Sequence, residues 1–588
     1  MCGVFGYVGK SGAAGKIVNG LKRLEYRGYD SWGIAVVKEG EIEVTKKVGA
    51  IGDLDVGEWP ESHIGVGHTR WATHGGVTEV NAHPHFSTDK SFVLAQNGIV
   101  ENYQDLKKNL INEDFEFISE TDTEVIVRLV EDKLKSVSDL REAVRLAFLD
   151  LEGRNTIVVL SSKIDHVIAV RNGSPLVVGV GSGEYFFASD TLSFADKTSR
   201  VVFINDGEIV EYKDGEISVF DAESGKKIDF TIEELENLDV DVDKSGYDHF
   251  MLKEIVEQKD TVRSAVQYSM KELEPLIGTV KKSSTVYTIG AGTASYEAGQ
   301  AAYFLRKIAG VKAVELKSYE VDSYRDLFSP NDLIIAYSQS GETADTVEAV
   351  EFAISRGAKV ASIVNMLGST LTRISDMPFF VRSGPEICVC STKAFSAKLS
   401  WSLLVSCAIA GKYDEAKKSI YCLSDMLQSY FSDKLFERIR DLSRKLKKSD
   451  HAFILGRGQN YYITLESALK IKEISYLHAE GFAGGELKHG VIALIEKGTP
   501  VFVLIGKDEE KENIISAAAE VKARGAWLIG VGQVENELFD EFIATPDVGV
   551  ASCISNVIPF QLVSYFLALE LGYDPDKPRN LAKSVTVK

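Results

Sequence analysis

The feature that most constrains the fold is a strand–turn–helix pattern that occurs twice in the second half of the chain. In each copy, a short β-branched run ends in a glycine-rich turn and passes into a helical stretch, and further runs follow. The runs are 285–289, 333–337 and 360–364 in the first copy and 451–455, 501–505 and 526–531 in the second. Strands that alternate with helices form parallel sheets covered on both faces. The pattern therefore predicts two similar α/β lobes.

The first 235 residues follow a different pattern, in which short β-branched or aromatic runs are mostly bounded by Gly, Asn or Asp. The predicted strands are 33–37, 92–95, 156–160, 166–171, 185–188 and 201–204. Helical patterns cover 15–24 and 123–133, and Thr121-Asp122 is the expected cap of the second helix. Runs of this kind are typical of strands. We therefore predict two sheets with helices packed outside them.

An acidic segment separates the two patterns. Residues 231–243 carry six acidic side chains and no aromatic one, as expected of a solvated helix end and linker. We place the domain boundary there. The predicted domains are 2–235, a linker at 236–255, a first lobe at 256–435, a second lobe at 436–577 and a C-terminal active-site tail at 578–588.

Composition narrows the classes of function. The net charge of -20 and the pI near 5.1 argue against nucleic-acid binding, because phosphate backbones need a basic surface. Six cysteines in so long a chain do not form a secreted disulfide framework, and the chain starts without the features of a signal peptide. The apolar runs 399–410 and 557–569 fall short of a membrane span. We expect a soluble, cytoplasmic protein that binds neither nucleic acid nor membrane.

Cys2 is a candidate nucleophile. Removal of Met1, which the small Cys2 side chain should permit, would place a thiol and a free α-amino group on one residue. An α-amino group titrates near pH ~8 and a thiol near ~8.5, so the amine can take the thiol proton directly or through a water. On its own Cys2 would be an arbitrary second residue. The polar motifs that follow it favour the catalytic interpretation.

Those motifs complete a candidate site for amide hydrolysis. Asn97-Gly98 offers a side-chain amide and a backbone N–H to the oxyanion that forms when a thiolate attacks an amide. The guanidinium of Arg70 matches the carboxylate of a free amino acid, and Asp122 matches its ammonium group. No metal is expected, since His83-Pro84-His85 and Cys388-Val389-Cys390 lack a second ligand pair at metal-site spacing.

Several motifs carry a resemblance to known enzymes over the whole chain. The N-terminal segments 1–3, 24–31, 70–75 and 119–124 resemble the glutaminase domain of the N-terminal-nucleophile glutamine amidotransferases. The segments 338–346, 391–395, 466–476, 485–490 and 578–583 resemble the glucosamine-6-phosphate synthase family. The fold implied is an α+β N-terminal-nucleophile glutaminase domain, an αββα sandwich, followed by two α/β sugar-isomerase (SIS) lobes with parallel sheets.

The resemblance also implies residue roles. Cys2 would attack the side-chain amide of glutamine to give a thioester and ammonia, with Asn97 and Gly98 as the oxyanion hole. The residues implied to bind glutamine are Arg70, Thr73, His74 and Asp122. Those implied to bind the phosphate of fructose 6-phosphate are Thr293, Ser338, Gln339, Ser340, Thr343 and Ser391. Several of these lie at a strand-to-helix turn, where hydroxyls and backbone N–H groups can hold a phosphate.

Four further residues are implied to perform the sugar chemistry. Glu473 would move a proton between C1 and C2, and His489 would open the ring. Lys470 and Lys583 would act near the C2 carbonyl, Lys583 through a Schiff base with the open-chain sugar. Lys470 and Glu473 are three residues apart on one face of the helical pattern 465–477. Without the flanking motifs, a surface ion pair would be the favoured interpretation of these two.

The family further implies a channel for ammonia gated by Trp71, a hinge at 244–247, a homodimer in which His489 reaches the neighbouring subunit's site, and no metal or organic cofactor. Ordinary core packing is the alternative for Trp71. Three positions depart from the usual family pattern, namely Trp32, Gln96 and Ala294, and Ser295 is a candidate for the hydroxyl missing at Ala294. These departures leave open the affinity for substrate and the packing of the residues around glutamine.

The expected reaction converts fructose 6-phosphate and glutamine to glucosamine 6-phosphate and glutamate, the first step of hexosamine synthesis. One alternative is an amidotransferase with another acceptor, such as amidophosphoribosyltransferase, which predicts one phosphoribosyl-binding lobe rather than two. Another is a glutaminase-linked sugar-phosphate sensor. A sensor without catalysis leaves Cys2, Glu473, His489 and Lys583 without a purpose.

Overall fold

The computed structural model describes residues 2–10, 12–52, 54, 59, 61–163, 165–235 and 243–586. The chain divides into two compact units. Unit 1 runs to Asp241 and includes the C-terminal segment from Ser584, and unit 2 is Val242–Lys583. Much of the acidic segment predicted as the linker lies outside the described residues. The predicted domain bounds stay predictions.

Unit 1 contains two antiparallel sheets. The first has the order β15 (Glu233–Glu234), β11 (Arg200–Phe203), β9 (Val177–Val180), β10 (Tyr185–Ala188), β1 (Gly3–Val8), β4 (Ile64–Arg70), β2 (Ser31–Lys38) and β3 (Glu41–Val48). The second has the order β14 (Lys227–Ile228), β13 (Glu216–Asp221), β12 (Glu208–Lys213), β8 (His166–Asn172), β7 (Asn155–Ser161), β6 (Phe92–Gly98) and β5 (His85–Phe86). The predicted strands of this region are all present.

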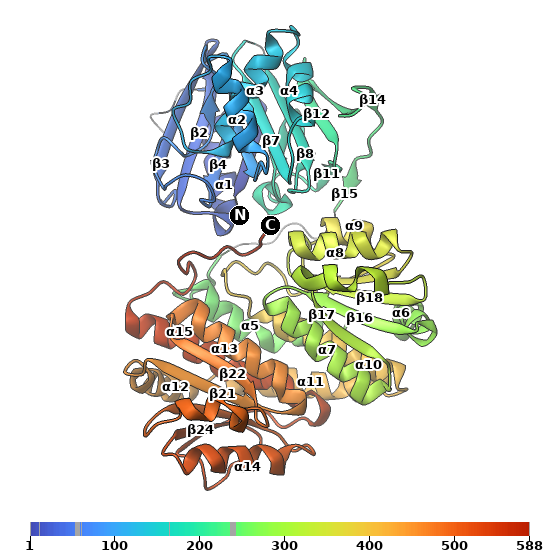
Figure 1. The fold of residues 1–588 in the computed structure, drawn as a ribbon, viewed down its shortest axis with the longest axis vertical. Coiled ribbons are helices and arrows are strands. Elements are labelled where there is room, and N and C mark those ends of the chain that lie inside the picture. The colour runs from blue at the N-terminus through green and yellow to red at the C-terminus, as the bar shows by residue number, and fades with distance from the viewer. Residues whose placement is uncertain are drawn as a thin grey trace. The chain divides into compact units, whose positions relative to one another are not determined.

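The two sheets pack face to face between helices, as Figure 1 shows. Successive side chains of a strand point to opposite faces, so Val4 of β1 packs against the second sheet while Phe5 packs under α1 (Ala13–Leu24). On the far side, α2 (Tyr103–Asn112), α3 (Asp122–Leu134) and α4 (Leu140–Leu149) cover the second sheet. This four-layer αββα arrangement confirms the predicted fold class. The side chain of Thr121 caps α3 as predicted, accepting from the Glu124 N–H.

Unit 2 contains two five-stranded parallel sheets with the same strand order. The first is β17 (Ala313–Lys317), β16 (Thr285–Gly290), β18 (Asp332–Tyr337), β19 (Lys359–Val364) and β20 (Met377–Phe380). The second is β22 (His478–Ala483), β21 (His451–Gly456), β23 (Pro500–Ile505), β24 (Trp527–Gly532) and β25 (Glu541–Ala544). Numbered within each lobe, both orders are 2-1-3-4-5. The structure thus confirms the predicted repeat.

The two lobes of unit 2 share one hydrophobic core. Its helices are α5 (Phe250–Ser264), α6 (Met270–Lys282), α7 (Thr293–Ala309), α8 (Ala344–Ser355), α9 (Thr370–Ile374), α10 (Lys393–Ile409), α11 (Tyr413–Tyr430), α12 (Asp433–Leu446), α13 (Tyr461–Ser475), α14 (Lys511–Lys522) and α15 (Ile558–Leu571). Helix α7 of the first lobe packs on α13 of the second. This contact lets side chains of both lobes meet in one site.

Two sequence predictions need correction here. The helical pattern placed at 465–477 forms α13, which begins earlier, at Tyr461, and ends at Ser475 because Tyr476 has a left-handed φ of 60°. The apolar run at 557–569 belongs to a longer helical stretch, Gly549–Leu571, that could cross a membrane by length and composition. However, 94% of its apolar window is buried in the protein, and core helices of soluble proteins pass the same test.

Candidate active site

In unit 1, Cys2 lies where two central strands of the first sheet meet. β1 begins directly after Cys2 and pairs with β4, so that Gly3 lies opposite Thr69. The Trp71 N–H donates to the Cys2 Sγ at 3.3 Å. Burial raises the pKa of the Cys2 thiol, against the lowering effects of the N-terminal charge and the Trp71 N–H. A buried thiol therefore needs a proton acceptor close by before it can attack.

Asn97 is fixed from both ends of its side-chain amide. Its Nδ2 donates to Ser189 Oγ at 2.7 Å, and its Oδ1 lies 3.0 Å from His68 Nε2. Ser189 Oγ also accepts from the Val4 N–H at 2.9 Å, which joins β1, β10 and β6 at this point. Burial lowers the pKa of His68 to about 3, so the imidazole is neutral and its Nε2–H can donate to Asn97. The second N–H of the Asn97 amide has no acceptor in the parts of the chain that the structure describes and could donate to an oxyanion.

Gly98 ends β6 in a conformation that suits glycine. Its φ is +128°, and an added Cβ would lie 1.9 Å from the carbonyl oxygen of Arg154. Any side chain here would displace the backbone of the neighbouring strand. The backbone next to Asn97 can therefore keep this shape only with glycine at position 98.

Arg70 ends β4, and the loop that follows it holds Thr73 and His74, two more of the predicted glutamine ligands. Arg70 donates to the carbonyl oxygens of Gly75 and Gly76, each at 3.1 Å, and to that of His74. The guanidinium of Arg70 therefore bonds to carbonyl oxygens of the loop and holds the loop in this conformation. Thr73 is exposed, and the His74 ring meets the edge of the Tyr103 ring at 5.0 Å.

Asp122 heads α3 close to this loop. Its Oδ2 accepts from the Val100 N–H at 2.9 Å, and burial raises its pKa. Asp122 and Arg70 both act on the charge of Cys2, so the structure brings these three predicted residues together. They form no ion pair with one another among the described residues.

Trp32 and Gln96, which depart from the family pattern, are both buried. Trp32 belongs to the core under α1. Gln96 donates through Nε2 to Asn155 Oδ1 at 2.7 Å and accepts from the Thr123 hydroxyl. Both polar groups of the Gln96 side chain therefore have hydrogen-bond partners in the packing next to Asn97.

In unit 2, the first lobe's strand order reverses between β16 and β18, and ligands of open α/β sheets bind at such a switch point. Ser338 directly follows β18, and its Oγ accepts from the Gly341 N–H at 2.9 Å. Thr343 is the N-cap residue of α8, and its hydroxyl lies 3.4 Å from Ser338 Oγ. The predicted phosphate ligands Ser338, Gln339, Ser340 and Thr343 thus form one turn at a helix N-terminus.

Thr293 and Ser295 follow the other strand at the switch point. Ser295 Oγ accepts from Lys317 Nζ at 2.8 Å. The same hydroxyl donates to the Gly292 carbonyl oxygen at 2.7 Å, and its role in place of the hydroxyl missing at Ala294 stays a prediction. Thr293 instead turns to the second lobe, where Lys470 Nζ donates to its Oγ1 at 3.0 Å.

Lys470 is the centre of a buried charge cluster on α13. Its Nζ lies 2.7 Å from Glu473 Oε2 and 3.1 Å from Glu466 Oε1, and its side chain is fully buried. Burial by itself lowers the pKa of Lys470, but the carboxylates of Glu466 and Glu473 raise it well above its usual value. Burial raises the pKa of Glu466 to about 8. The surface-pair interpretation of Lys470 and Glu473 is therefore wrong.

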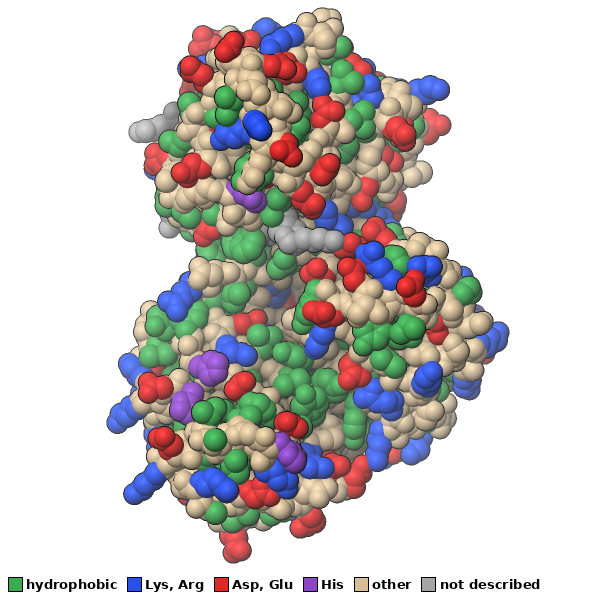
Figure 2. All heavy atoms as spheres, in the orientation of Figure 1, with side chains coloured by type: hydrophobic (Ala, Val, Ile, Leu, Met, Phe, Trp, Pro, Cys, Tyr) green, Lys and Arg blue, Asp and Glu red, His purple; other side chains and the backbone are tan. Residues whose placement is uncertain are grey.

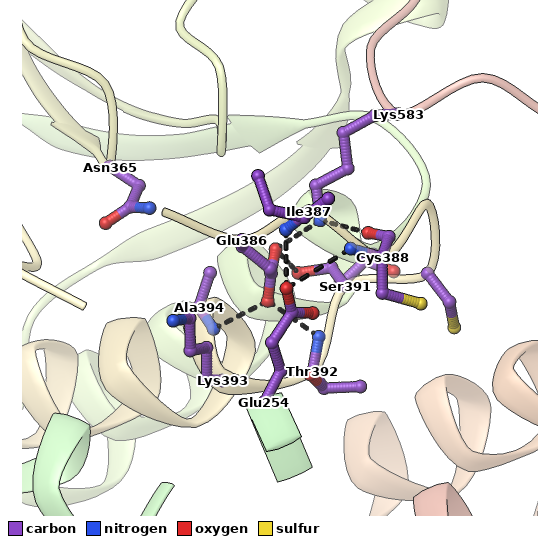
Figure 3. Close-up of polar contacts among 12 residues, drawn as sticks. Glu254, Asn365, Glu386, Ile387, Cys388, Ser391, Thr392, Lys393, Ala394 and Lys583 are labelled. Atoms are coloured by element: carbon purple, nitrogen blue, oxygen red, sulfur yellow. Dashed lines mark hydrogen bonds and ion pairs between the residues drawn. The ribbon is translucent and has the colours of Figure 1, made fainter. Parts of the chain in front are cut away.

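Lys583 lies in a second buried cluster, drawn in Figure 3. Its Nζ donates to Glu386 Oε2 at 2.5 Å and to the Cys388 carbonyl at 2.8 Å. Ser391 Oγ donates to the same Glu386 oxygen at 3.0 Å. Glu254 of α5 accepts from the backbone N–H of Ile387 and of Cys388 through Oε1, whereas its buried Oε2 has no hydrogen-bond partner within the described part of the chain.

His489 stands apart from these clusters. It ends the short 3-10 helix Leu487–His489, and its side chain is exposed. The single chain does not bring it to Glu473 or Lys583. Among the described residues, no three His, Cys, Asp or Glu side chains are grouped so that they could hold a metal ion.

Comparisons with known proteins agree with this geometry. A glutamine amidotransferase domain matches residues 42–228, and a SIS domain matches 279–405 and again 445–570. The glutamine–fructose-6-phosphate aminotransferase (isomerizing) of Pyrococcus horikoshii is 40% identical over the full length of both chains. The chain belongs to this aminotransferase family.

Two other members of the aminotransferase family support this assignment. The protein of the same name from Thermococcus kodakarensis is 38% identical, again over the full length of both chains. The solved C-terminal domain of glucosamine-fructose-6-phosphate aminotransferase from Francisella tularensis is 32% identical, with a TM-score of 0.51. It covers 57% of this chain and 100% of that domain. The family resemblance read from the sequence is therefore confirmed.

Sequence reasoning missed several residues of the two sites. Ser189 and His68 fix Asn97, Glu254 and Glu386 surround Lys583, and Glu466 completes the Lys470 cluster. Glu466 could have been found, since it precedes Lys470 by one helical turn. Ser189 and Glu254 are far in sequence from the groups they contact, and only the fold brings them there.

Proposed function

We propose that this chain makes glucosamine 6-phosphate and glutamate from fructose 6-phosphate and glutamine. The observation that carries the proposal is the presence, on one chain, of a Cys2 site with a fixed oxyanion donor and a buried Lys470–Glu473 cluster beside a phosphate-binding turn. The first is suited to releasing ammonia from an amide. The second is suited to moving a proton on a sugar phosphate.

The first half-reaction takes place in unit 1. After removal of Met1, the α-amino group of Cys2 accepts the thiol proton, and Sγ attacks the side-chain carbonyl of glutamine. The free N–H of Asn97 and the backbone at Gly98 stabilise the oxyanion. The α-ammonium returns the proton to the leaving ammonia, and water then hydrolyses the thioester to glutamate. Thr73, His74, Asp122 and the loop held by Arg70 bind the substrate's amino-acid end.

The second half-reaction takes place in unit 2. The turn at the N-terminus of α8, together with Ser391, binds the phosphate through hydroxyls and N–H groups. His489 opens the ring, and ammonia replaces the C2 carbonyl oxygen to form an imine. Glu473 then removes a proton from C1 and a proton is delivered to C2, which gives the aldose with an amine at C2. Lys470 stabilises the carboxylate of Glu473 meanwhile.

Lys583 acts next to the C2 carbonyl. A Schiff base with the open-chain ketose requires its ammonium group to lose a proton first, and Glu386 lies in contact with that group. Attack of ammonia on this Schiff base would release Lys583 and leave the C2 imine.

The assembly is proposed to be a cytoplasmic homodimer. Because His489 is exposed in the single chain, it would act in the neighbouring subunit's site. Ammonia would pass from Cys2 to the sugar through a channel gated by Trp71, with the hinge at 244–247. The protein would need no nucleic acid, membrane or cofactor.

The test is the ratio of the two products, measured with both substrates and purified protein. Wild type should form glutamate and glucosamine 6-phosphate in near-equal amounts. Cys2→Ala should lose the synthesis that depends on glutamine and keep synthesis from added ammonium salts, since unit 2 is unchanged. Glutamate without aminosugar from wild type would contradict the proposal and leave a glutaminase with sensing lobes.

A further inference from the structure

An extended segment of unit 2, residues 386–392, contacts the side chains to which we assign the sugar chemistry. Lys583 bonds to Glu386 and to the Cys388 carbonyl, as Figure 3 shows. Two residues further along, Cys390 turns to the other cluster. Its Sγ lies 3.1 Å from Glu473 Oε2, the carboxylate to which proton transfer is assigned. None of the roles described above includes this thiol.

The Cys390 thiol is placed to act as a hydrogen-bond donor. It is 1% exposed, and burial raises its pKa well above the ordinary value. The sulfur therefore keeps its proton, and a carboxylate oxygen at 3.1 Å can only accept. A buried, protonated thiol of this kind is inert as a nucleophile. We therefore consider the hydrogen bond that Cys390 donates to Glu473.

The two oxygens of Glu473 differ in their surroundings. Oε2 receives both the Cys390 thiol and, at 2.7 Å, the ammonium group of Lys470. Oε1 has no hydrogen-bond partner among the described residues, and the side chain remains 21% exposed. Two donors from different elements therefore fix the carboxylate by one oxygen and leave the other open.

We propose that Cys390 is a positioning residue for the proton transfer, holding Oε2 of Glu473 so that Oε1 takes the proton from C1 of the sugar and delivers it to C2. The inference rests on the proposed sugar chemistry. Carbon–proton transfer by a carboxylate depends strongly on the angle and distance of the accepting oxygen.

Other charged and titratable groups surround this pair and remain in place when only Cys390 is changed. They are Lys470 and Glu466 on α13, Tyr296 and Glu297 on α7, and Lys398 on α10, which pairs with Glu297. Differences between Cys390 variants therefore report on the thiol.

The experiment measures exchange of the C1 hydrogen of fructose 6-phosphate for deuterium in D2O, by NMR and without glutamine, so that the proposed Schiff base of Lys583 activates C1 in place of the ammonia-derived imine and unit 1 takes no part. The variants are Cys390→Ala and Cys390→Val, which remove the donor with and without leaving a cavity, and Cys390→Ser, which keeps a donor. Cys407→Ala is the control, because Cys407 is another buried thiol, in α10 and outside the site. Thermal unfolding of each variant shows that it is folded.

Cys390→Ala and Cys390→Val should lower the maximal exchange rate about tenfold, with the KM for the sugar within about twofold of wild type, since the thiol does not bind the sugar. Cys390→Ser should recover most of the lost rate, and Cys407→Ala should match wild type.

Three results would overturn parts of this account. Exchange rates of Cys390→Ala and Cys390→Val equal to that of wild type would overturn the role of Cys390 alone. A Cys390→Ser enzyme as slow as Cys390→Ala would show that packing, and not the donor, matters at this position. No exchange by wild type at any pH would overturn the proposed sugar chemistry together with this inference.

Discussion

At the residue scale, two glutamates beside Lys583 show how burial and charge act on the same chemical group. Burial raises the pKa of Glu254 to about 8, and the charge of Glu386 acts in the same direction, against the lowering effect of Lys583. Burial acts on Glu386 in the same direction, but the Lys583 ammonium and the N–H groups of Ala394 and Thr392 outweigh it and lower that pKa to about 2. At neutral pH, Glu386 is the charged partner of Lys583 and Glu254 holds a proton.

Glu254 should therefore make stability depend on pH. Its folded-state pKa lies above the unfolded value, so the native state binds a proton that the unfolded state releases, and this contribution to stability is lost as pH rises from about 4.5 to about 8. Glu254→Gln mimics the protonated form. Relative to wild type, we expect its free energy of unfolding to increase by a few kcal/mol between pH 5 and pH 8, because each pKa unit of difference corresponds to about 1.4 kcal/mol. A difference that is constant with pH, measured by urea unfolding, would contradict this.

Gly98 offers a test of the glutaminase site. Gly98→Ala forces a Cβ against the Arg154 carbonyl and displaces the backbone next to Asn97. We expect glutamine hydrolysis to fall by about 100-fold or more, as when an oxyanion donor is lost, while deuterium exchange into fructose 6-phosphate is kept. Gly40→Ala is the matched control, because Gly40 also has a positive φ but an added Cβ meets no neighbour. Equal activities of the two variants would contradict the role of Gly98.

At the element scale, the start of α5 links the chain's C-terminal tail to the sugar site. Asp576 accepts from the N–H groups of Phe250 and Met251, the first two residues of α5, at 2.9 and 2.8 Å. The same helix carries Glu254, and the tail carries Lys583 seven residues after Asp576. Asp576 therefore holds the helix that carries Glu254 next to the tail that carries Lys583.

Asp576→Ala should disturb the sugar chemistry as well as stability. Loss of a helix cap costs about 1 kcal/mol, and here the helix and the tail would also separate. We expect a lower thermal midpoint and a loss of sugar exchange of at least tenfold, with glutamine hydrolysis kept. Ser269→Ala removes the capping box of α6, far from the cluster, and should lower stability by a similar amount without loss of exchange. A pure stability effect of Asp576→Ala would contradict the link.

At the scale of the whole molecule, the residues proposed for the two half-reactions lie in separate compact units, so the proposed synthesis would depend on ammonia transfer. Unit 1 holds Cys2, and unit 2 holds Lys470 and Lys583. Figure 2 shows acidic and basic side chains interspersed over the visible face of each unit. Ammonia that reaches water near neutral pH is protonated and no longer attacks a carbonyl.

Trp71→Ala should therefore uncouple the two reactions. The side chain follows Arg70 directly and is only partly buried, and its backbone contacts Cys2. We expect glutamate formation to continue while aminosugar formation falls, so that the ratio of glutamate to glucosamine 6-phosphate rises severalfold. Trp71→Phe, which keeps an aromatic ring, should stay near a ratio of one. An unchanged ratio in Trp71→Ala would assign Trp71 to ordinary packing.

The sequence by itself determined the layers and the chemistry carried by short motifs. Alternating apolar positions specify strands and 3.6-residue spacing specifies helices, so the predicted strands and the two-lobe repeat are confirmed. Cys2, Asn97-Gly98 and the turn at Ser338 are local features of the chain, and each lies at a strand end as expected. The limits of α13 were less well predicted, because a left-handed Tyr476 ends it without a glycine signal.

Only the tertiary structure decided which distant residues share a site and which charges are buried. Ser189 reaches Asn97 across two sheets, and Glu254 reaches the 386–388 backbone from another helix. The spacing of Lys470 and Glu473 by itself would favour a surface ion pair, but the packing of α7 on α13 buries the Lys470 side chain. Contacts between side chains that are far apart in the sequence form only when the sheets and helices pack together. The same packing decides which charged groups are removed from solvent. No local pattern in the chain encodes either.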